Sequence, residues 1–287
     1  MAKRWLYVRI PSPSEPQSEL LAEGLFAAGA SSVQQEPDAL VSYLPDRGDA
    51  EAQIGELRTL LSRVAGSAVE LDWERRDDED WAREWRRGLG PRRIGQRLVL
   101  TPTWVAPAAD TDDIVIRIDP QMAFGTGEHA TTRGVLQLLE SQVTPGSRVL
   151  DMGTGSGVLA IAAARLGAGF ALAVDNDPDA LINAAENVAR NGVGAQVELQ
   201  EALVDDAFLA RHAAEGFDLI LANVLSGVLR PLLPAFARAL RPAGALILSG
   251  ILEEEAEEMR QAAVAAGLAP AREVREEEWW TALFRLR

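Results

Sequence analysis

The residues with the clearest chemistry are three glycines that alternate within residues 149–157, Val-Leu-Asp-Met-Gly-Thr-Gly-Ser-Gly. A hydrophobic run leads into Gly153, Gly155 and Gly157, and an apolar helical pattern follows at once. Glycines at such a turn let the backbone bend sharply and let a ligand lie against it, because no Cβ atom intervenes. The N–H groups at the start of the following helix can then bind polar ligand atoms. The pattern predicts a site for a nucleotide, a flavin or S-adenosylmethionine.

Three polar residues near this turn narrow the choice of ligand. Asp175 ends the next strand-like segment, 22 residues after Gly153, where a carboxylate can accept both ribose hydroxyls of an adenosyl group. Asp151 precedes the glycines, and its charge suits the cationic amino acid part of S-adenosylmethionine but would repel a pyrophosphate. Asn223 ends a fourth strand-like segment, in the crevice where such sheets bind ligands. These residues favour S-adenosylmethionine over NAD and over a degenerate, non-catalytic fold.

A second glycine-rich segment lies upstream, at residues 119–132. Two glycines flank Thr126, Phe124 precedes them, and the hydroxyl pair Thr131 and Thr132 follows. A loop with these residues can fold over a ligand while the hydroxyls bond its polar end. A turn followed by a threonine that caps the next helix fits the same residues equally well.

The elements that would position these residues alternate between strand and helix from residue 99 onward. This alternation predicts parallel βαβ units in a doubly wound sheet. We expect strands at residues 148–151, 171–175, 197–202, 217–223, 245–249 and 282–286, and helices at 133–140, 157–166, 179–191, 229–240 and 253–266. The last strand has no room for a crossover helix after residues 271–274, so it should pair antiparallel, as in a hairpin.

The first part of the chain predicts a separate small α+β unit. We expect strands at residues 5–10, 32–35, 40–44 and 67–73, and helices at 15–28 and 50–64. This β-α-β-β-α-β order is that of a ferredoxin-like fold. No chemistry is visible in it, which suggests a docking role. A helix at residues 77–91 follows, with Trp81 and Trp85 on one face. It can be an interdomain linker, a surface helix that buries both tryptophans, or both at once.

Several of these segments together resemble the PrmA family, the methyltransferases of large-subunit ribosomal protein eleven. The similar strings are Ala-Phe-Gly-Thr-Gly-Glu-His-Ala-Thr-Thr at residues 123–132, Asp-Met-Gly-Thr-Gly-Ser-Gly at 151–157 and Asn-Val-Leu at 223–225. Residues 78–87, 249–252 and 278–279 are also similar. The first string is specific, whereas most class I methyltransferases share the glycine string. The resemblance is strong from residue 78 onward. Before residue 78 only the pattern of strands and helices is similar, and no motif is shared.

The resemblance implies a class I methyltransferase fold that binds S-adenosylmethionine, with an N-terminal domain that recognises the ribosomal protein. We accordingly divide the chain into a substrate-recognition domain (1–73), a mobile linker helix (74–95) and a methyltransferase domain (96–287). The residues expected to bind the cofactor are Thr132, Gly153, Gly155, Asp175 and Asn223. The candidate catalytic residues are Asn223, Phe124 and Thr126, the last two in a loop that closes on the site.

The acceptor in this reaction would be an amine of a lysine side chain, of the N-terminus, or of both. A sulfonium is already an activated methyl donor, so the protein needs to align a neutral amine and exclude water. A lysine with a reference pKa of about 10.4 must first lose a proton, and a desolvated slot beside a positive sulfonium lowers that pKa without a dedicated base. We expect the Asn223 side chain or nearby carbonyls to orient the amine. The alternative is that Glu128 or His129 acts as the base.

The amino-acid composition bears on the metal sites, binding partners and cellular location that the protein can have. The 287 residues include no cysteine and two histidines, so we expect no disulfide and no metal site. A net charge of −15 is poorly suited to stable nucleic-acid binding and permits a basic protein partner. No apolar run approaches the ~20 residues that cross a bilayer. We expect a cytoplasmic monomer.

Two other functions fit parts of the sequence. The first is a class I methyltransferase that acts on RNA or a small molecule. Enzymes that methylate planar nitrogens commonly carry Asn-Pro-Pro-Tyr, where residues 223–226 here read Asn-Val-Leu-Ser, and this counts against that class. The second is a non-catalytic binding module on the ribosome, which the intact glycine turn, Asp175 and Asn223 disfavour.

Overall fold

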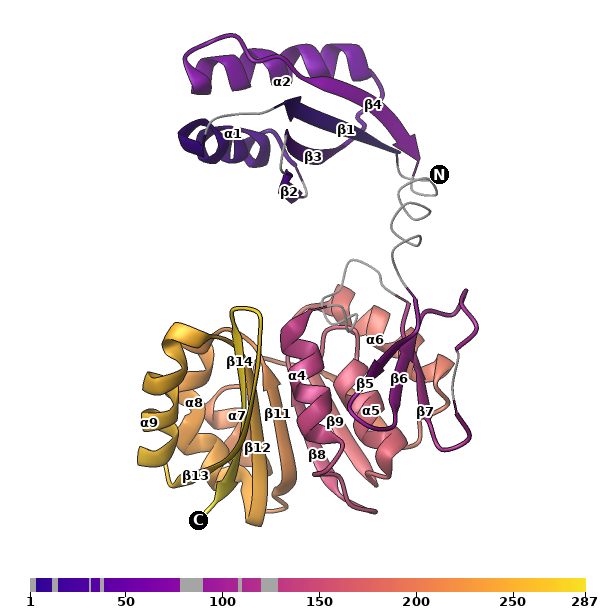
Figure 1. The fold of residues 1–287 in the computed structure, drawn as a ribbon, viewed down its shortest axis with the longest axis vertical. Helices are drawn as coiled ribbons and strands as arrows, with labels where there is room; N and C mark the ends of the chain where they lie inside the picture. The colour runs from indigo at the N-terminus through magenta and orange to yellow at the C-terminus, as the bar shows by residue number, and fades with distance from the viewer. Residues whose placement is uncertain are drawn as a thin grey trace. The chain divides into compact units, whose positions relative to one another are not determined.

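The computed structural model describes residues 4–11, 15–30, 32–36, 39–77, 90–107, 110–119 and 129–287. They belong to two compact units, Met1–Leu89 and Gly90–Arg287 (Figure 1). Each unit has hydrophobic clusters of its own, so each is described by itself.

The first unit is a four-stranded sheet with two helices. Its elements are β1 (Arg4–Pro11), α1 (Glu15–Ala27), β2 (Ser32–Glu36), β3 (Ala39–Pro45), α2 (Ala50–Ala65) and β4 (Asp72–Asp77). The strands lie in the order β2-β3-β1-β4, and every neighbouring pair is antiparallel. Alternate residues of β1, Leu6, Val8 and Ile10, are buried in one cluster with apolar residues of both helices. The helices therefore cover one face of the sheet.

The closing strand of this unit begins later than the sequence pattern predicts. The alternation of Val69, Leu71 and Trp73 predicts a strand at residues 67–73, but β4 pairs with β1 only from Asp72 to Asp77. Ahead of the strand, the N–H of Val69 donates to the Ser62 hydroxyl of α2 at 3.1 Å and so does not bond to a neighbouring strand. Residues 74–77, expected in the linker helix, are thus strand. The rest of that helix, with Trp81 and Trp85, falls in residues 78–89, outside the described residues.

The second unit is built on a seven-stranded sheet in the order β10-β9-β8-β11-β12-β14-β13. Its strands are β8 (Arg148–Met152), β9 (Phe170–Asp175), β10 (Val197–Glu201), β11 (Phe217–Asn223), β12 (Leu240–Leu252), β13 (Leu268–Glu276) and β14 (Trp279–Leu286). The first five strands of that order pair in parallel, whereas β14 is antiparallel to both β12 and β13. The predicted antiparallel last strand is confirmed.

Helices cover both faces of this sheet, as a doubly wound fold requires (Figure 1). They are α4 (Ala130–Leu139), α5 (Val158–Leu166), α6 (Pro178–Arg190), α7 (Asp206–His212), α8 (Ser226–Ala239) and α9 (Ala256–Ala265), with the short 3-10 helix η1 (Glu253–Glu255) before α9. One hydrophobic cluster joins the sheet to α4 and α5, and another joins the opposite face to α7, α8 and α9. Along β8, Val149 belongs to the first cluster and Leu150 to the second, because successive side chains of a strand point to opposite faces.

A small sheet that the sequence pattern does not predict opens this unit. It consists of β5 (Arg92–Ile94), β6 (Leu98–Thr101) and β7 (Ile114–Arg117), with β5 antiparallel and β7 parallel to β6. Its apolar residues belong to the same cluster as α4 and α5. The Glu140 carboxylate after α4 accepts the N–H groups of Gln96 and Arg97, each at 2.7 Å. The second unit consequently begins at Gly90, ahead of the boundary expected at residue 96.

Candidate functional site

The glycine turn lies between β8 and α5, where the sequence predicts it. The N–H groups of Gly153 and Thr154 both donate to the carbonyl of Val174 on β9, at 2.8 and 3.0 Å. The φ angles of Gly153, Gly155 and Gly157 are +68°, +53° and +82°, a region that side chains rarely adopt. A Cβ atom on Gly153 would also lie 2.7 Å from the Val224 side chain. The turn therefore requires glycine, and the Val224 side chain takes up the space that a Cβ on Gly153 would need.

Asp151 lies beneath this turn and is fully buried. Its Oδ2 accepts the Thr154 hydroxyl at 2.6 Å and the N–H of Ala160 in α5 at 3.1 Å. Its Oδ1 is buried without a hydrogen-bond partner among the described residues. Burial raises the pKa of Asp151 to about 6, against the lowering effect of the two hydrogen bonds. A buried carboxylate with one unsatisfied oxygen is stabilised by a cationic group placed nearby.

Asp175 at the end of β9 contacts the glycine turn directly. Its Oδ2 accepts the N–H of Gly155 at 2.9 Å, and its Oδ1 accepts the N–H of Asp177 at 3.1 Å. A carboxylate oxygen has two acceptor positions, so each oxygen can still accept a further hydroxyl proton. The structure thus brings Gly155 and Asp175 together, with acceptor capacity left for a ribose.

Asn223 and Thr132 also meet, although 91 positions separate them. The Asn223 Nδ2 at the end of β11 lies 3.5 Å from the Thr132 hydroxyl in the first turn of α4, and Asn223 is half-buried. The start of α4 is held there because the buried Ser249 hydroxyl contacts the Thr131 carbonyl at 3.1 Å and the Thr281 hydroxyl at 2.7 Å. The antiparallel strand β14, which carries Thr281, therefore helps to place Thr132 beside Asn223.

His129 caps α4, a role that sequence reasoning considered only for a threonine. Its Nδ1 accepts the N–H of Thr131 at 3.4 Å and lies 2.8 Å from the Thr131 hydroxyl. Its ring meets Trp279 edge-on, with 5.0 Å between centroids. Phe124, Thr126 and Glu128 lie outside the described residues.

The described residues fit an adenosine-bearing cation. The three glycines keep side chains off the backbone of the turn, Asp175 has acceptors for a ribose, and the unsatisfied Oδ1 of Asp151 suits a positive group. Within the described ranges, no group of three histidine, aspartate or glutamate residues could hold a metal ion. No helix in the same ranges is long and apolar enough to cross a membrane.

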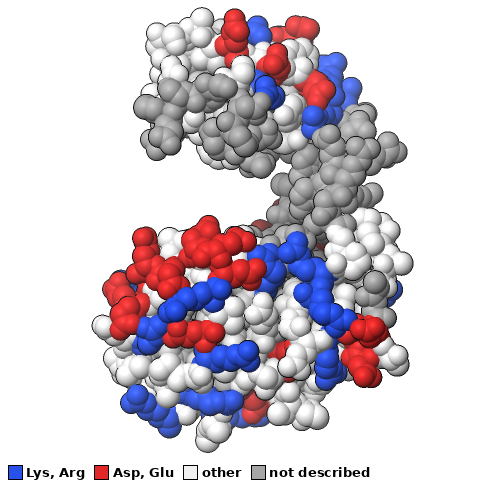
Figure 2. Space-filling view, in the orientation of Figure 1, with Lys and Arg blue, Asp and Glu red and all other residues white. Residues whose placement is uncertain are grey.

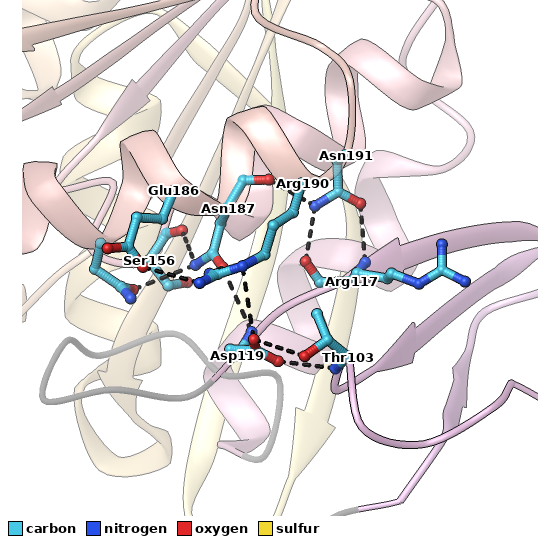
Figure 3. Close-up of polar contacts among 9 residues, drawn as sticks. Thr103, Arg117, Asp119, Ser156, Glu186, Asn187, Arg190 and Asn191 are labelled. Atoms are coloured by element: carbon cyan, nitrogen blue, oxygen red, sulfur yellow. Dashed lines mark hydrogen bonds and ion pairs between the residues drawn. The ribbon is translucent and has the colours of Figure 1, made fainter.

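Sequence reasoning missed one group of polar residues behind this site. Asn187 in α6 and Asn191 directly after α6 are both buried (Figure 3). Asn187 contacts Ser156 of the glycine turn and Asp119 after β7, and Asn191 contacts Arg117 at the end of β7. The signal that could have found them is asparagine at every fourth position, 183, 187 and 191, within an otherwise amphipathic helix.

Acidic side chains gather on the second unit near the start of α9 and the β13–β14 turn, on the face seen in Figure 2. Most of them are paired with arginines, in the ion pairs Arg275–Glu253, Arg260–Glu257, Arg230–Glu258, Arg133–Glu276 and Arg133–Glu277. These four arginines therefore offset part of the negative charge of the patch.

The chain is similar in sequence and in structure to methyltransferases of ribosomal protein L11. Residues 13–287 match the family model PrmA, described as "Ribosomal protein L11 methyltransferase (PrmA)". The ribosomal protein L11 methyltransferase of Pelotomaculum thermopropionicum is 44% identical over 246 residues, which cover 85% of this chain and 78% of the relative. That of Heliobacterium modesticaldum is 36% identical over 307 residues, covering 96% and 95%. The crystal structure of ribosomal protein L11 methylase from Lactobacillus delbrueckii subsp. bulgaricus superposes with a TM-score of 0.59 at 32% identity, covering 69% of this chain and 100% of that one.

Proposed function

We propose that this chain, which belongs to the PrmA family of ribosomal protein L11 methyltransferases, transfers methyl groups from S-adenosylmethionine to amines of that ribosomal protein. The acceptors are lysine side chains, the N-terminal amine, or both. The observation that carries the proposal is the Asp175 carboxylate held at 2.9 Å against the N–H of Gly155. It joins a ribose acceptor to a glycine turn with a buried carboxylate beneath it, a combination that suits an adenosyl cation better than a pyrophosphate.

Each described site residue has a distinct task in this proposal. Asp175 accepts the ribose hydroxyls, and Asp151 stabilises the cationic amino group from below the turn. Gly153 and Gly155 let the backbone approach the ligand. Thr132 and Asn223, which contact each other, bound the site from the α4 side.

The bound cofactor supplies a methyl group that is already activated on a sulfonium. What remains for the protein is to hold a neutral amine in line and to exclude water. The side chain of Asn223, which is half-buried at the strand end, or nearby carbonyls orient the amine. A buried slot disfavours the charged ammonium form, which lowers the pKa of the acceptor amine. We assign no covalent intermediate.

The contacts of His129 support a capping role for this residue over a role as base. Its Nδ1 faces the Thr131 N–H and hydroxyl, so its position is explained by the start of α4. Phe124 and Thr126 remain proposed contributors on the strength of the resemblance, and Glu128 remains the alternative base.

We assign substrate recognition to the first unit, as a ferredoxin-like domain joined through residues 78–89 to the methyltransferase domain. Its order β2-β3-β1-β4 and its separate hydrophobic cluster support this assignment. None of the candidate cofactor or catalytic residues lies in it. We expect the enzyme to act as a cytoplasmic monomer whose partner is the ribosomal protein.

The test is to incubate the enzyme with radiolabelled S-adenosylmethionine and separated ribosomal components. We expect ribosomal protein L11 to take up the label, and we expect mass spectrometry to find the methyl groups on its amines. Label on ribosomal RNA instead would favour the alternative class of RNA methyltransferases. The absence of transfer to any component, with the cofactor bound, would favour the non-catalytic module.

A further inference from the structure

Helix α6 and the residue after it carry three buried asparagines on one face. Asn183, Asn187 and Asn191 are 2%, 0% and 8% exposed. Asparagine is a poor residue for the interior of a helix, and a buried amide is unfavourable unless it is hydrogen-bonded. Three of them at four-residue spacing therefore call for specific partners.

Asn187 joins two segments that are far apart in the chain (Figure 3). Its Nδ2 donates to the carbonyl of Ser156, which lies inside the glycine turn, at 2.9 Å. Its Oδ1 accepts the N–H of Asp119 at 3.4 Å and an Arg190 N–H at 2.9 Å. One amide group thus binds the glycine turn with its donor end and the chain after β7 with its acceptor end.

Asp119 is held from two further directions. Its carboxylate accepts the N–H and the hydroxyl of Thr103, both at 2.8 Å, and lies 3.6 Å from the Arg190 guanidinium (Figure 3). Arg190 is in turn bonded to Glu186 on α6 at 2.9 Å. The chain after β7 therefore has a defined position relative to α6 at Asp119.

Asn191 makes a similar attachment without reaching the glycine turn. Its Oδ1 accepts the N–H of Arg117 at 2.8 Å, and its Nδ2 donates to the Arg117 carbonyl at 2.7 Å. Asn191 therefore ties β7 to α6 by two hydrogen bonds, as a neighbouring strand would. It provides a matched comparison for Asn187.

We propose that Asn187 is a positioning residue for cofactor binding, because it fixes the glycine turn relative to Asp119. The proposal rests on the assignment of the glycine turn to the cofactor. The chemistry requires an amide: an aspartate would keep the acceptor for Arg190 and the Asp119 N–H but would lose the donor. It would also place a carboxylate oxygen against the Ser156 carbonyl. A turn without this support samples more conformations, and binding must then restrict them.

The test compares Asn187→Asp, Asn187→Ala and the control Asn191→Ala in the full chain. Calorimetry measures the Kd for S-adenosylhomocysteine, thermal unfolding gives Tm, and steady-state assays give KM for the cofactor and kcat. Loss of the partners that orient the ligands of a metal site weakens affinity by about 10- to 100-fold, and we take the lower end of that range as the scale for this turn. We expect both Asn187 variants to raise Kd and KM by about tenfold with kcat changed less than about threefold. We expect Asn191→Ala to lower Tm comparably with little change in Kd.

The proposal would be overturned if Asn187→Ala and Asn191→Ala lowered Tm equally and also raised Kd equally. Asn187 would then have only a structural role. If Asn187→Ala fails to fold, Asn187→Asp decides, since it is isosteric and keeps the contact with Arg190; wild-type affinity in that variant would also overturn the proposal. A wild-type protein that does not bind S-adenosylhomocysteine at all would instead refute the proposed function, and this inference with it.

Discussion

The N–H of Gly155 donates to Oδ2 of Asp175 at 2.9 Å, so the middle glycine of the turn and the carboxylate at the end of β9 form one structural unit. The same carboxylate holds the N–H of Asp177, the residue that caps α6. A ligand that bonds to Asp175 consequently acts on the turn and on the start of α6 together.

The first prediction concerns this carboxylate. Asp175→Ala should weaken the binding of S-adenosylmethionine by roughly 1.5–3 kcal/mol, as expected for the loss of hydrogen bonds to a charged group. Asp177→Ala is the control, because it removes only the side-chain cap on Asp179 and should reduce stability by about 1 kcal/mol. Titration calorimetry measures both affinities. Unchanged affinity in Asp175→Ala, or tight binding of NAD by the wild type, would contradict the assignment.

The second prediction separates backbone strain from crowding at the turn. Gly153→Ala and Gly192→Ala both place a side chain at a similar φ, +68° and +66°, at a cost of roughly 1–2 kcal/mol each. Only at Gly153 does the new Cβ meet another group, Val224 at 2.7 Å, whereas nothing lies within 4 Å at Gly192. Chemical denaturation should therefore show the larger loss of stability for Gly153→Ala. Equal losses would mean that Val224 moves aside freely, and adding Val224→Ala should then have no effect.

The third prediction concerns pH. Burial raises the pKa of Asp151 from its ordinary 3.8 to about 6 in the folded protein. Between these values the folded protein holds a proton that the unfolded chain has released, so this residue makes folding less favourable as pH rises through that window. Asp151→Asn should remove this slope from the free energy of unfolding measured between pH 4 and about 6.

Binding of the cofactor should show the opposite trend with pH. A cationic ligand favours the ionised carboxylate, so affinity should fall as the pH drops below about 6, by up to about tenfold for each pH unit. Calorimetry across this range should show the fall in the wild type and a flat profile in Asp151→Asn. Asp205→Asn, at the start of α7, is a control that should keep the wild-type profile. A pH-dependent affinity that survives in Asp151→Asn would remove Asp151 from the cofactor site.

The fourth prediction concerns the division of labour between the two units. A chain that begins at Gly90 keeps β5, with buried Ile94 and the contacts of Arg93 to Asp113 at 2.5 and 2.7 Å, whereas one that begins at Gln96 lacks them. The longer chain should unfold at the higher Tm and bind S-adenosylhomocysteine as the full chain does. It should lose methyl transfer to the ribosomal protein. Full transfer by the chain beginning at Gly90 would refute substrate recognition by the first unit.

The sequence alone was sufficient for the features that depend on local pattern. Alternating apolar segments and glycines predict β8, the turn after it and α5, since a positive φ at three alternate positions needs glycine. The short connection before β14 predicts its antiparallel pairing, because a parallel return needs a crossover. The apolar segments that precede Asp175 and Asn223 place both residues at the ends of strands. Parallel strands bring their carboxyl ends to one edge of the sheet, so both residues were expected at that edge.

Tertiary structure alone decided which of these residues touch and what supports them. The contact between Asn223 and Thr132 depends on Ser249 and Thr281, from two strands that are far apart in sequence. The strands of the small sheet β5–β7 have three or four residues each, too few for their pattern to stand out, and their apolar residues pack in one cluster with α4 and α5. The four-residue spacing of Asn183, Asn187 and Asn191 marks one face of α6, but it does not tell which segments bond to that face. Ser156 and Asp119 are far from Asn187 in the sequence, so only the folded chain reveals them as its partners.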